Sequence, residues 1–508
     1  MPSATYAMFL DRVRELSTWG QIGSLLGWDQ ETYMPPKAVH DRANQIAAIA
    51  GLAHEKLVSD EMGKLLTELR GEIGDATAGT KAGDADGVVA ANVREVRRSY
   101  DRAVKLPTAL VQEIARESSL AQEAWRVARA GSDFARFAPH LEKLLDLKRE
   151  VADRFGWDTE PYDALLDEFE PGARAADIQT IFDALKKELV PLVAALAKAP
   201  RQPDQSILKR SCPVAQQETF NRRVLERMGF DFQAGRIDRS AHPFCSGTTP
   251  SDVRLTTRYD EHYFPMSLFG SMHEAGHGLY EQGFDPIHTG TPMAQAVSLG
   301  IHESQSRLWE NMVGRSRPFW EHWLPEFQQT FTNIAGVPVD DFVRAINTVR
   351  PSFIRVEADE VTYGLHIMLR FDLERQMIAG KLPVASVPER WDALFKEYFG
   401  LTPPSVADGC LQDIHWSLSI FGYFPTYQLG NLYAAQFFAA ARRARPDLDG
   451  QLRRGELAPL RAWLRENIHR HGMRYRAHEL VERVTGSKPS HAAYVQYLHA
   501  KYKPLYGL

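Results

Sequence analysis

Apolar residues recur at steps of three and four over most of this 508-residue chain, and this pattern constrains the fold more than any other feature. Such spacing places apolar side chains along one face of an α-helix. The pattern returns in the ranges 106–130, 132–155 and 175–199, and near the start of the chain it is carried by Met8, Phe9, Val13, Leu16, Trp19, Ile22, Leu25 and Leu26. We therefore predict a mostly α-helical protein.

Local signals mark several element ends. The stretches "SDFARF", which starts at Ser132, and "GARAADIQ", which starts at Gly172, are typical of helix starts, and Gly156 is typical of a helix end. One segment departs from the helical pattern. The sequence "SDVRLTTRYD", residues 251–260, carries β-branched residues in loose alternation and predicts a short strand.

The chain contains no Gly/Pro-rich linker long enough to divide it into independent domains. Residues 74–87, "GDATAGTKAGDADG", combine four glycines and three aspartates and predict a flexible surface loop between helices. We therefore expect one large helical body over residues 1–508, with two lobes around a groove.

Composition and charge exclude several classes of protein. The net charge of −5 gives no electrostatic reason to expect nucleic acid or an anionic membrane as a partner. No run approaches the roughly 18 apolar residues of a membrane span. The three cysteines form no disulfide framework. Asp11, Arg12 and Arg14 interrupt the apolar run that a signal peptide would need, so the sequence predicts a cytoplasmic protein.

Residues 271–283, "SMHEAGHGLYEQG", contain a metal-ligand pattern. His273 and His277 lie four positions apart, so both imidazoles project from one helix face and can reach one ion. Glu274 lies beside them, where a carboxylate can take a proton from a water that the metal activates. Gly276 costs such a helix about 1 kcal/mol relative to Ala, which indicates that another group approaches the helix closely. The alternative is an amphipathic helix with two surface histidines.

A catalytic zinc usually has three protein ligands. The extended three-histidine pattern would need Gly at position 280 and His at position 283, which are Tyr and Gly here. Glu303, 26 residues after His277, is our candidate for the third ligand, with a break at residues 290–293 between the two helices. His302 is the competing ligand, and it points about 100° away around the helix. Glu303 could also form an i,i+4 pair with Arg307, which is compatible with ligation.

Two neutral imidazoles and one carboxylate would leave a zinc site with a net positive charge, which activates water and polarises a carbonyl. Cobalt or manganese would also suit these ligands. Glu274 could then act as general base toward water and general acid toward a leaving amine. This chemistry is typical of amide hydrolysis, and the residues alone do not separate endopeptidases from exopeptidases.

Several further motifs appear in a fixed order with the histidine motif: "LLGWDQETYMPP" at 25–36, "HPF" at 242–244, "DVRLT" at 252–256, "HESQ" at 302–305, "IRVEAD" at 354–359 and "GCLQDIHW" at 409–416. Together they resemble the thermostable metallocarboxypeptidases typified by carboxypeptidase Taq, over nearly the whole chain. The resemblance implies a saddle-like, mostly helical homodimer with a long substrate groove. The strand predicted at 251–260 lies just before the histidine motif and would place a small β element beside the metal-binding helix. It also implies broad release of single C-terminal residues from peptides with a free carboxylate.

Two other functions remain open. A dipeptidyl carboxypeptidase or oligopeptidase could use the same metal site, and its products would be dipeptides or internal fragments rather than free amino acids. A helical peptide-binding scaffold could carry a structural or vestigial metal site. Glu274 weighs against the scaffold, since a structural site has no use for a base beside its ligands.

A carboxypeptidase needs a cation for the substrate's α-carboxylate, and the planar fork of arginine suits this task. By resemblance, Arg355 is our candidate; its alternative role is an i,i+4 pair with Asp359 on one helix. Arg254, on the predicted strand, resembles a residue that closes the groove and limits substrate length. Its alternative is an exposed strand arginine.

The oxyanion of the reaction needs hydrogen-bond donors. His415 and Tyr423 resemble such donors in similar helical peptidases, although each could instead be a structural residue. His242 and Gln305 resemble groove residues that contact the substrate.

Overall fold

The computed structural model describes residues 3–73 and 87–508. The loop predicted over residues 74–87 lies outside the described residues, except for Gly87, which precedes the first turn of a helix. No helix in the described part of the chain combines the length and the apolar character needed to cross a membrane.

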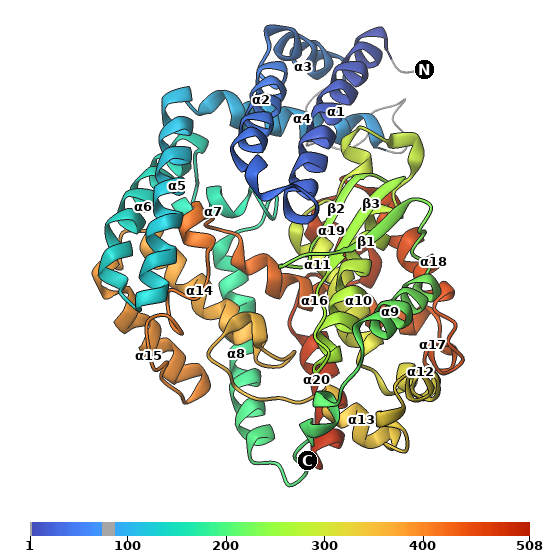
Figure 1. Ribbon diagram of the computed structural model, residues 1–508. Helices are drawn as coiled ribbons and strands as arrows, with labels where there is room; N and C mark the ends of the chain where they lie inside the picture. Colours follow the sequence, from blue (N-terminus) through green and yellow to red (C-terminus); the bar gives the residue numbers. More distant parts are fainter. Residues whose placement is uncertain (1–2, 74–86) are drawn as a thin grey trace.

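The chain is mostly α-helical, as predicted (Figure 1). The four helices expected from apolar periodicity are all present, as α1 (Ala4–Thr32), α5 (Thr108–Gly131), α6 (Phe134–Phe155) and α8 (Ala175–Ala197). The other helices are α2 (Val39–Leu57), α3 (Asp60–Ile73), α4 (Val88–Lys105), α7 (Pro161–Leu166), α9 (Val214–Met228), α10 (Phe264–Glu281), α11 (Leu299–Arg307), α12 (Arg317–Thr330), α13 (Val339–Ile346), α14 (Tyr363–Ile378), α15 (Val387–Phe399), α16 (Phe424–Ala444), α17 (Leu448–Arg453), α18 (Ala458–Asn467), α19 (Ala477–Thr485) and α20 (Ala492–Tyr506).

Helix ends follow the sequence signals. The Asp133 side chain accepts a hydrogen bond from the backbone N–H of Arg136, which satisfies a free donor in the first turn of α6. Gly156 ends α6 with a φ of 85°, a conformation that glycine adopts without steric penalty. The predicted start near residue 172 and the observed start of α8 at Ala175 also agree.

A three-stranded sheet interrupts the helices. Its strands are β1 (Gly235–Arg239), β2 (Cys245–Thr249) and β3 (Asp252–Thr257), in the order β1-β3-β2, with β1 parallel and β2 antiparallel to β3. Strand β3 is the strand predicted at 251–260, and its fully buried Val253 and Leu255 pack on the interior. The sheet contacts α10, so a small β element lies beside the helix with the histidine motif.

The buried apolar residues form two groups. The larger core extends in sequence from Leu110 to Tyr506 and includes the faces of α10, α11, α14 and α16. The smaller core joins α1, α3 and α4 through Tyr6, Phe9, Val13, Met62, Leu66, Leu69, Val93 and Val96. The N-terminal helices therefore have a core of their own, apart from the one that supports the histidine motif.

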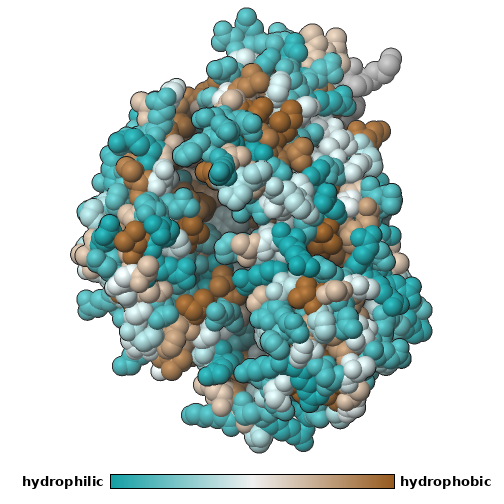
Figure 2. Space-filling model, viewed as in Figure 1, coloured by the Kyte–Doolittle hydropathy of each residue, from teal (hydrophilic) through white to brown (hydrophobic). Residues whose placement is uncertain are grey.

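Figures 1 and 2 show the protein in the same orientation. In Figure 1, α5, α6, α14 and α15 lie on the left, the sheet with α9 and α10 lies on the right, and α1 to α3 lie above them. Figure 2 shows that the surface is hollowed in the middle of this face, below the α1–α2 pair.

Candidate metal centre and substrate-binding residues

Close backbone contacts fix the two helices that carry the histidine motif and Glu303. A Cβ atom on Gly276 of α10 would lie 2.6 Å from the backbone oxygen of Gln305 and from the Cα atom of Ser306 on α11. A Cβ atom on Gly430 of α16 would lie 2.5 Å from Cγ of Glu303. Helix α11 therefore packs between two glycine positions. The close approach predicted at Gly276 is confirmed, and the approaching group is the backbone of α11.

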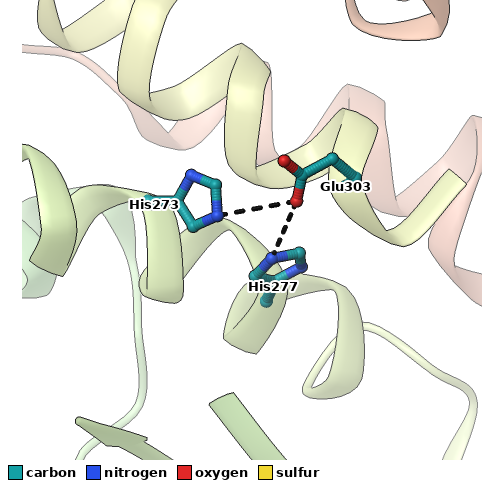
Figure 3. Close-up of side chains that lie close together, drawn as sticks. All are labelled: His273, His277 and Glu303. Carbon is teal, nitrogen blue, oxygen red and sulfur yellow. Dashed lines mark ion pairs between the residues drawn. The ribbon is translucent and has the colours of Figure 1, made fainter. Parts of the chain in front are cut away.

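His273, His277 and Glu303 converge, as Figure 3 shows. Oε2 of Glu303 lies 3.5 Å from Nε2 of His273 and 3.3 Å from Nε2 of His277. All three candidate ligand atoms lie within 4.8 Å of one another. Among the described residues, these three form the group of His, Cys, Asp and Glu side chains whose geometry could hold a metal ion.

The geometry of this group fits a tetrahedral ion. Bonds of about 2.0–2.1 Å to nitrogen and oxygen place neighbouring tetrahedral ligands about 3.3 Å apart. The two distances from Glu303 Oε2 are close to this value. The donor set, two imidazoles and one carboxylate, is also that of a catalytic zinc site with a fourth position for water or substrate.

His302 and Glu303, the two candidates for the third ligand position, have different partners. Nε2 of His302 lies 2.8 Å from Oε1 of Glu281, and its ring stacks on His277 at 4.4 Å. The second carboxylate oxygen of Glu303 accepts a hydrogen bond of 2.7 Å from Nε of Arg307. The expected Glu303–Arg307 pair is therefore present together with the two histidine contacts.

A second carboxylate, that of Glu310, contacts the ring of His273. Nδ1 of His273 lies 2.9 Å from Oε2 of Glu310, which leaves Nε2 directed at Glu303. Burial lowers the pKa of His273, but Glu303 and Glu310 outweigh burial and raise it. Burial, together with the neighbouring His302, lowers the pKa of His277 to about 3, which keeps this imidazole neutral. Neutral imidazole is the form that binds metal.

Glu274 is 6% exposed and points from the same helix as the two histidines. Burial raises the pKa of Glu274 to about 7, and this effect outweighs the opposing influence of His273. A carboxyl group with a pKa near neutrality can both accept and donate a proton at physiological pH.

Arg355 belongs to a buried cationic cluster. Its Nε and Nη2 donate to Oδ1 of Asp413 at 3.0 and 2.8 Å, and Nε of the fully buried Arg370 donates to Oδ2 at 2.6 Å. Two guanidinium groups share one carboxylate, so the cluster carries one uncompensated positive charge. The alternative pair with Asp359 is wrong: Arg355 lies in the short 3₁₀ turn Arg355–Glu357 (η7), and Asp359 accepts from backbone N–H groups.

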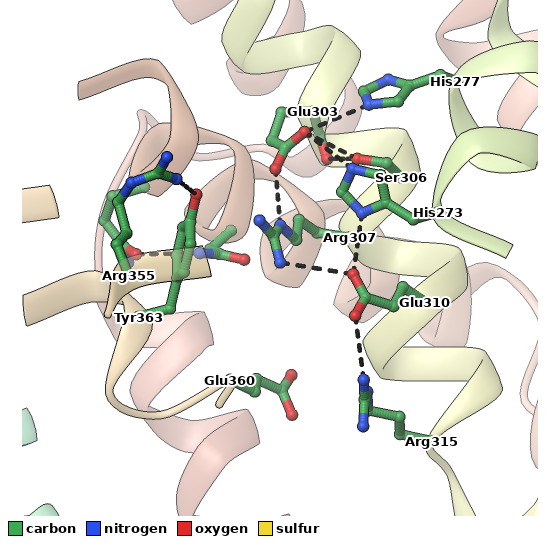
Figure 4. A network of polar contacts seen from close by, with 12 residues as sticks. His273, His277, Glu303, Ser306, Arg307, Glu310, Arg315, Arg355, Glu360 and Tyr363 are labelled. Atoms are coloured by element: carbon green, nitrogen blue, oxygen red, sulfur yellow. Dashed lines mark hydrogen bonds and ion pairs between the residues drawn. The ribbon is translucent and has the colours of Figure 1, made fainter. Parts of the chain in front are cut away.

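A continuous series of contacts joins this cluster to the metal-ligand group (Figure 4). Arg307, which binds Glu303, has its guanidinium 4.4 Å from the ring centroid of Tyr363. The Tyr363 hydroxyl in turn accepts a hydrogen bond of 3.1 Å from Nη1 of Arg355. Two side chains, Arg307 and Tyr363, therefore link Glu303 to Arg355 through direct contacts.

The two candidate oxyanion donors lie beside the cationic cluster. His415 opens the 3₁₀ turn His415–Leu418 (η9), and its Nδ1 lies 3.9 Å from Oδ1 of Asp413. Its ring centroid is 5.6 Å from that of Tyr423, which directly precedes α16. Burial lowers the pKa of His415 to about 4, so the imidazole is neutral near pH 7. Burial also raises the pKa of Tyr423, so its hydroxyl stays protonated and remains a donor.

The remaining candidates lie in different surroundings. Arg254 on β3 forms a bidentate pair with Asp252, and its guanidinium lies 4.4 Å from the ring centroid of Trp28 on α1. His242 is exposed in the connection between β1 and β2. Gln305 is 0% exposed, and its Oε1 lies 2.8 Å from Nε2 of His469. The structure therefore leaves no part of the Gln305 side chain at the surface.

Sequence reasoning did not find Glu310, Tyr363, Arg370 or Asp413 as parts of these groups. Glu310 lies seven positions after Glu303, two helical turns away, and that spacing could have indicated a shared face. Asp413 lies within the quoted "GCLQDIHW" stretch, and its partner Arg355 is 58 positions away. No local pattern indicates such a pairing.

Comparison with known proteins agrees with these observations. Residues 8–502 match the family model described as carboxypeptidase Taq (M32) metallopeptidase. The chain is 43% identical to thermostable carboxypeptidase 1 of Thermus thermophilus, over 100% of both chains, and 36% identical to carboxypeptidase 1 of Bacillus subtilis, over 98% of both. A crystal structure of an M32 carboxypeptidase from Deinococcus radiodurans superimposes with a TM-score of 0.95, at 40% identity and with 100% of both chains covered.

Proposed function

Because the chain belongs to the carboxypeptidase Taq (M32) family and is a metallocarboxypeptidase, we propose that it releases single amino acids, with broad preference, from the free C-terminus of peptides. The observation that carries the proposal is the link between two groups of residues. The histidine–glutamate group is linked to the cationic cluster around Arg355 through Arg307 and Tyr363.

His273, His277 and Glu303 would hold one divalent ion per chain, and their donor set favours zinc, with cobalt or manganese as substitutes. When bound, the ion would supply Lewis acidity that polarises the scissile carbonyl and lowers the pKa of water. Glu310 would hold His273 with Nε2 toward the ion, through the contact at Nδ1.

Glu274 is the proposed general base and acid. Its carboxylate would take a proton from the attacking water and deliver it to the leaving amine. The buried position of Glu274 next to His273 supports this role, because a carboxyl group with a pKa of about 7 exchanges protons readily near neutral pH.

Arg355 is the proposed receptor for the substrate's α-carboxylate. Its cluster has two buried guanidinium groups for the single carboxylate of Asp413, so an incoming carboxylate would neutralise the remaining charge. His415 and Tyr423, beside this cluster, are the proposed donors to the oxyanion.

For the part of the groove that holds the rest of the peptide, we propose Arg254 and His242 as contacts. Arg254 is 18% exposed and fixed by Asp252, so it would limit the groove rather than move with the substrate. Gln305 would act indirectly, since its hydrogen bond to His469 holds α11 in place.

Release of free amino acids from a short peptide, compared with its amidated copy, tests the proposal. Zinc-loaded enzyme should release single residues from the free-acid peptide alone, and chelation or Glu274→Gln should abolish release. Glu123→Gln is a matched control, because it removes the same charge at a 64% exposed position on α5. A series of peptides that differ only in the last residue would measure the breadth of preference.

Other products would identify a different enzyme. Dipeptides as the first products would favour a dipeptidyl carboxypeptidase, and equal cleavage of the amidated copy would favour an oligopeptidase and remove the role of Arg355. Tight metal binding without cleavage of any peptide would favour a peptide-binding scaffold.

We further propose a homodimer of single-domain chains, from the family resemblance, and a cytoplasmic location. The three cysteines are unpaired, which suits a reducing compartment. Analytical ultracentrifugation and cell fractionation would test these two points.

A further inference from the structure

The two histidines of the candidate metal centre are held in different ways. Nδ1 of His273 lies 2.9 Å from Oε2 of Glu310, and this contact fixes the ring with Nε2 toward Glu303. Nδ1 of His277, in contrast, is buried and has no hydrogen-bond partner among the described residues. A histidine that binds a metal usually donates its other ring nitrogen to an acceptor, and this bond sets the orientation of the ring. In the described part of the chain, no such bond orients His277.

A stack of rings takes the place of this bond. The ring of His302 on α11 lies 4.4 Å from the ring of His277 on α10, centroid to centroid, and the two planes are inclined by only 20°. The last torsion of a histidine side chain has broad minima, so it needs an outside contact to fix it. A flat ring against one face of His277 restricts this rotation. The fully buried Tyr280 adds a third ring, with its centroid 5.5 Å from that of His302.

The His302 ring is itself anchored. Its Nε2 lies 2.8 Å from Oε1 of Glu281, and the two side chains are only 18% and 19% exposed. Strand β2 lies against the carboxylate, since a Cβ atom on Gly247 would be 2.7 Å from Oε2 of Glu281. Glu281 follows His277 by one turn of α10, and His302 directly precedes Glu303 on α11. Each of the two helices therefore contributes one candidate metal ligand and one member of the His302–Glu281 pair.

We propose that His302 is a positioning residue for the candidate ligand His277. Its ring, anchored by Glu281, holds the His277 imidazole with Nε2 toward the metal ion. This inference rests on the proposed metal ligands. It gives a role to the histidine that the sequence offered as a competing ligand, and in this role His302 contacts the ring of a ligand and not the ion.

Zinc affinity, measured by competition with a chromogenic chelator, tests this role. His302→Ala removes the ring and should weaken zinc binding about tenfold, as does the loss of other groups that orient a metal ligand. His302→Phe restores a flat ring that can stack but has no nitrogen, so its zinc affinity should stay within about twofold of that of the unchanged protein. If the alanine variant does not fold, His302→Leu gives the same comparison, because leucine fills space without a flat ring.

Cobalt(II) provides a second readout, since its visible absorption depends on the geometry of its ligands. The spectrum of the cobalt-loaded His302→Ala variant should differ from that of the unchanged protein, and the spectrum of His302→Phe should match it. His140→Ala is the matched control. It removes an imidazole that contacts a glutamate, Glu117, on two helices that carry none of the candidate ligands, α6 and α5. This control should change neither zinc affinity nor the cobalt spectrum.

Two results would overturn the proposal. Unchanged zinc affinity and an unchanged cobalt spectrum in His302→Ala would show that the ring does not orient His277. Equal losses of zinc affinity in His302→Ala and His302→Phe would show that a nitrogen of His302 matters and the stack does not. Failure of the unchanged protein to bind zinc would instead refute the proposed metal centre, and with it this inference, so the two failures can be told apart.

Discussion

Replacement of Gly276 by alanine adds one methyl group, which has two opposing effects: it raises the helix propensity of α10, and it crowds the contact between α10 and α11. Alanine is favoured over glycine in a helix interior by about 1 kcal/mol, so propensity alone predicts a more stable protein. The added Cβ, however, would lie 2.6 Å from the backbone of α11 at Gln305 and Ser306. Backbone atoms cannot rotate away as a flexible side chain can, so the helices themselves must move.

The size of the movement follows from the contact. Ordinary van der Waals contact begins at 3.4 Å, so α11 would have to withdraw by about 0.8 Å from a starting distance of 2.6 Å. Overpacking of this kind costs typically about 1–3 kcal/mol, which equals or exceeds the gain in propensity. Glu303 lies on the displaced helix, and its Oε2 is 3.3–3.5 Å from the two histidine nitrogens. A displacement near 1 Å in such a site can reduce activity about a hundredfold.

Gly270 provides the control, because it lies on the same helix and a Cβ there would meet its nearest neighbour, Oγ1 of Thr257, at 3.5 Å. We expect Gly276→Ala to lower the melting temperature and weaken zinc binding, whereas Gly270→Ala should keep zinc affinity and match or exceed the original melting temperature. Differential scanning fluorimetry and competition with a chromogenic chelator measure both quantities. If the two variants behave alike in both assays, the backbone contact does not position Glu303.

Three further changes test other parts of the structure. Glu310→Gln keeps a hydrogen-bond acceptor for His273 but removes the negative charge of Glu310. It should weaken zinc binding about ten- to a hundredfold in the same chelator competition. Unchanged zinc affinity would contradict a supporting role of Glu310. Arg355→Lys keeps the charge but loses the fork, and should reduce kcat/KM for free-acid peptides about a hundredfold. Equal kcat/KM would exclude Arg355 as the carboxylate receptor. Burial raises the pKa of Glu374 from 4.5 to about 7. Glu374 therefore loses its proton at a lower pH in the unfolded chain than in the folded protein, so the free energy of unfolding should fall by up to about 3 kcal/mol as pH rises from 4.5 to 7. In Glu374→Gln, the melting temperature should no longer fall over this pH range for this reason. Parallel profiles of melting temperature against pH for the variant and the unchanged protein would refute the reasoning.

The parts of the fold that could be predicted are those encoded by local periodicity. Helices α1, α5, α6 and α8 have apolar residues at helical spacing, so their positions follow from the sequence. Strands β1 and β2 were not predicted, because "GRIDR" and "CSGTT" show no apolar alternation. These strands form because β3 offers both of its edges, which is a tertiary effect.

The same distinction applies to the candidate site. His273, His277 and Glu303 could be named as candidate ligands because one helix face and the spacing to a following helix constrain them. The contact between His302 and Glu281, which engages the imidazole of the competing candidate, could not be predicted from the sequence. The environment of Arg355 could not be predicted, because its partner Asp413 is distant in sequence and is brought near by packing of the loop before η9.

Arg307 shows why a local pair can be more than a surface feature. Its pairing with Glu303 at i,i+4 would contribute only a few tenths of a kcal/mol on an exposed helix. Here the pair is buried, and it leaves one oxygen of Glu303 for the two histidines. Arg307 also packs on Tyr363, whose hydroxyl binds Arg355. The candidate metal ligands and the proposed carboxylate receptor are thus joined by three successive contacts with no flexible segment between them.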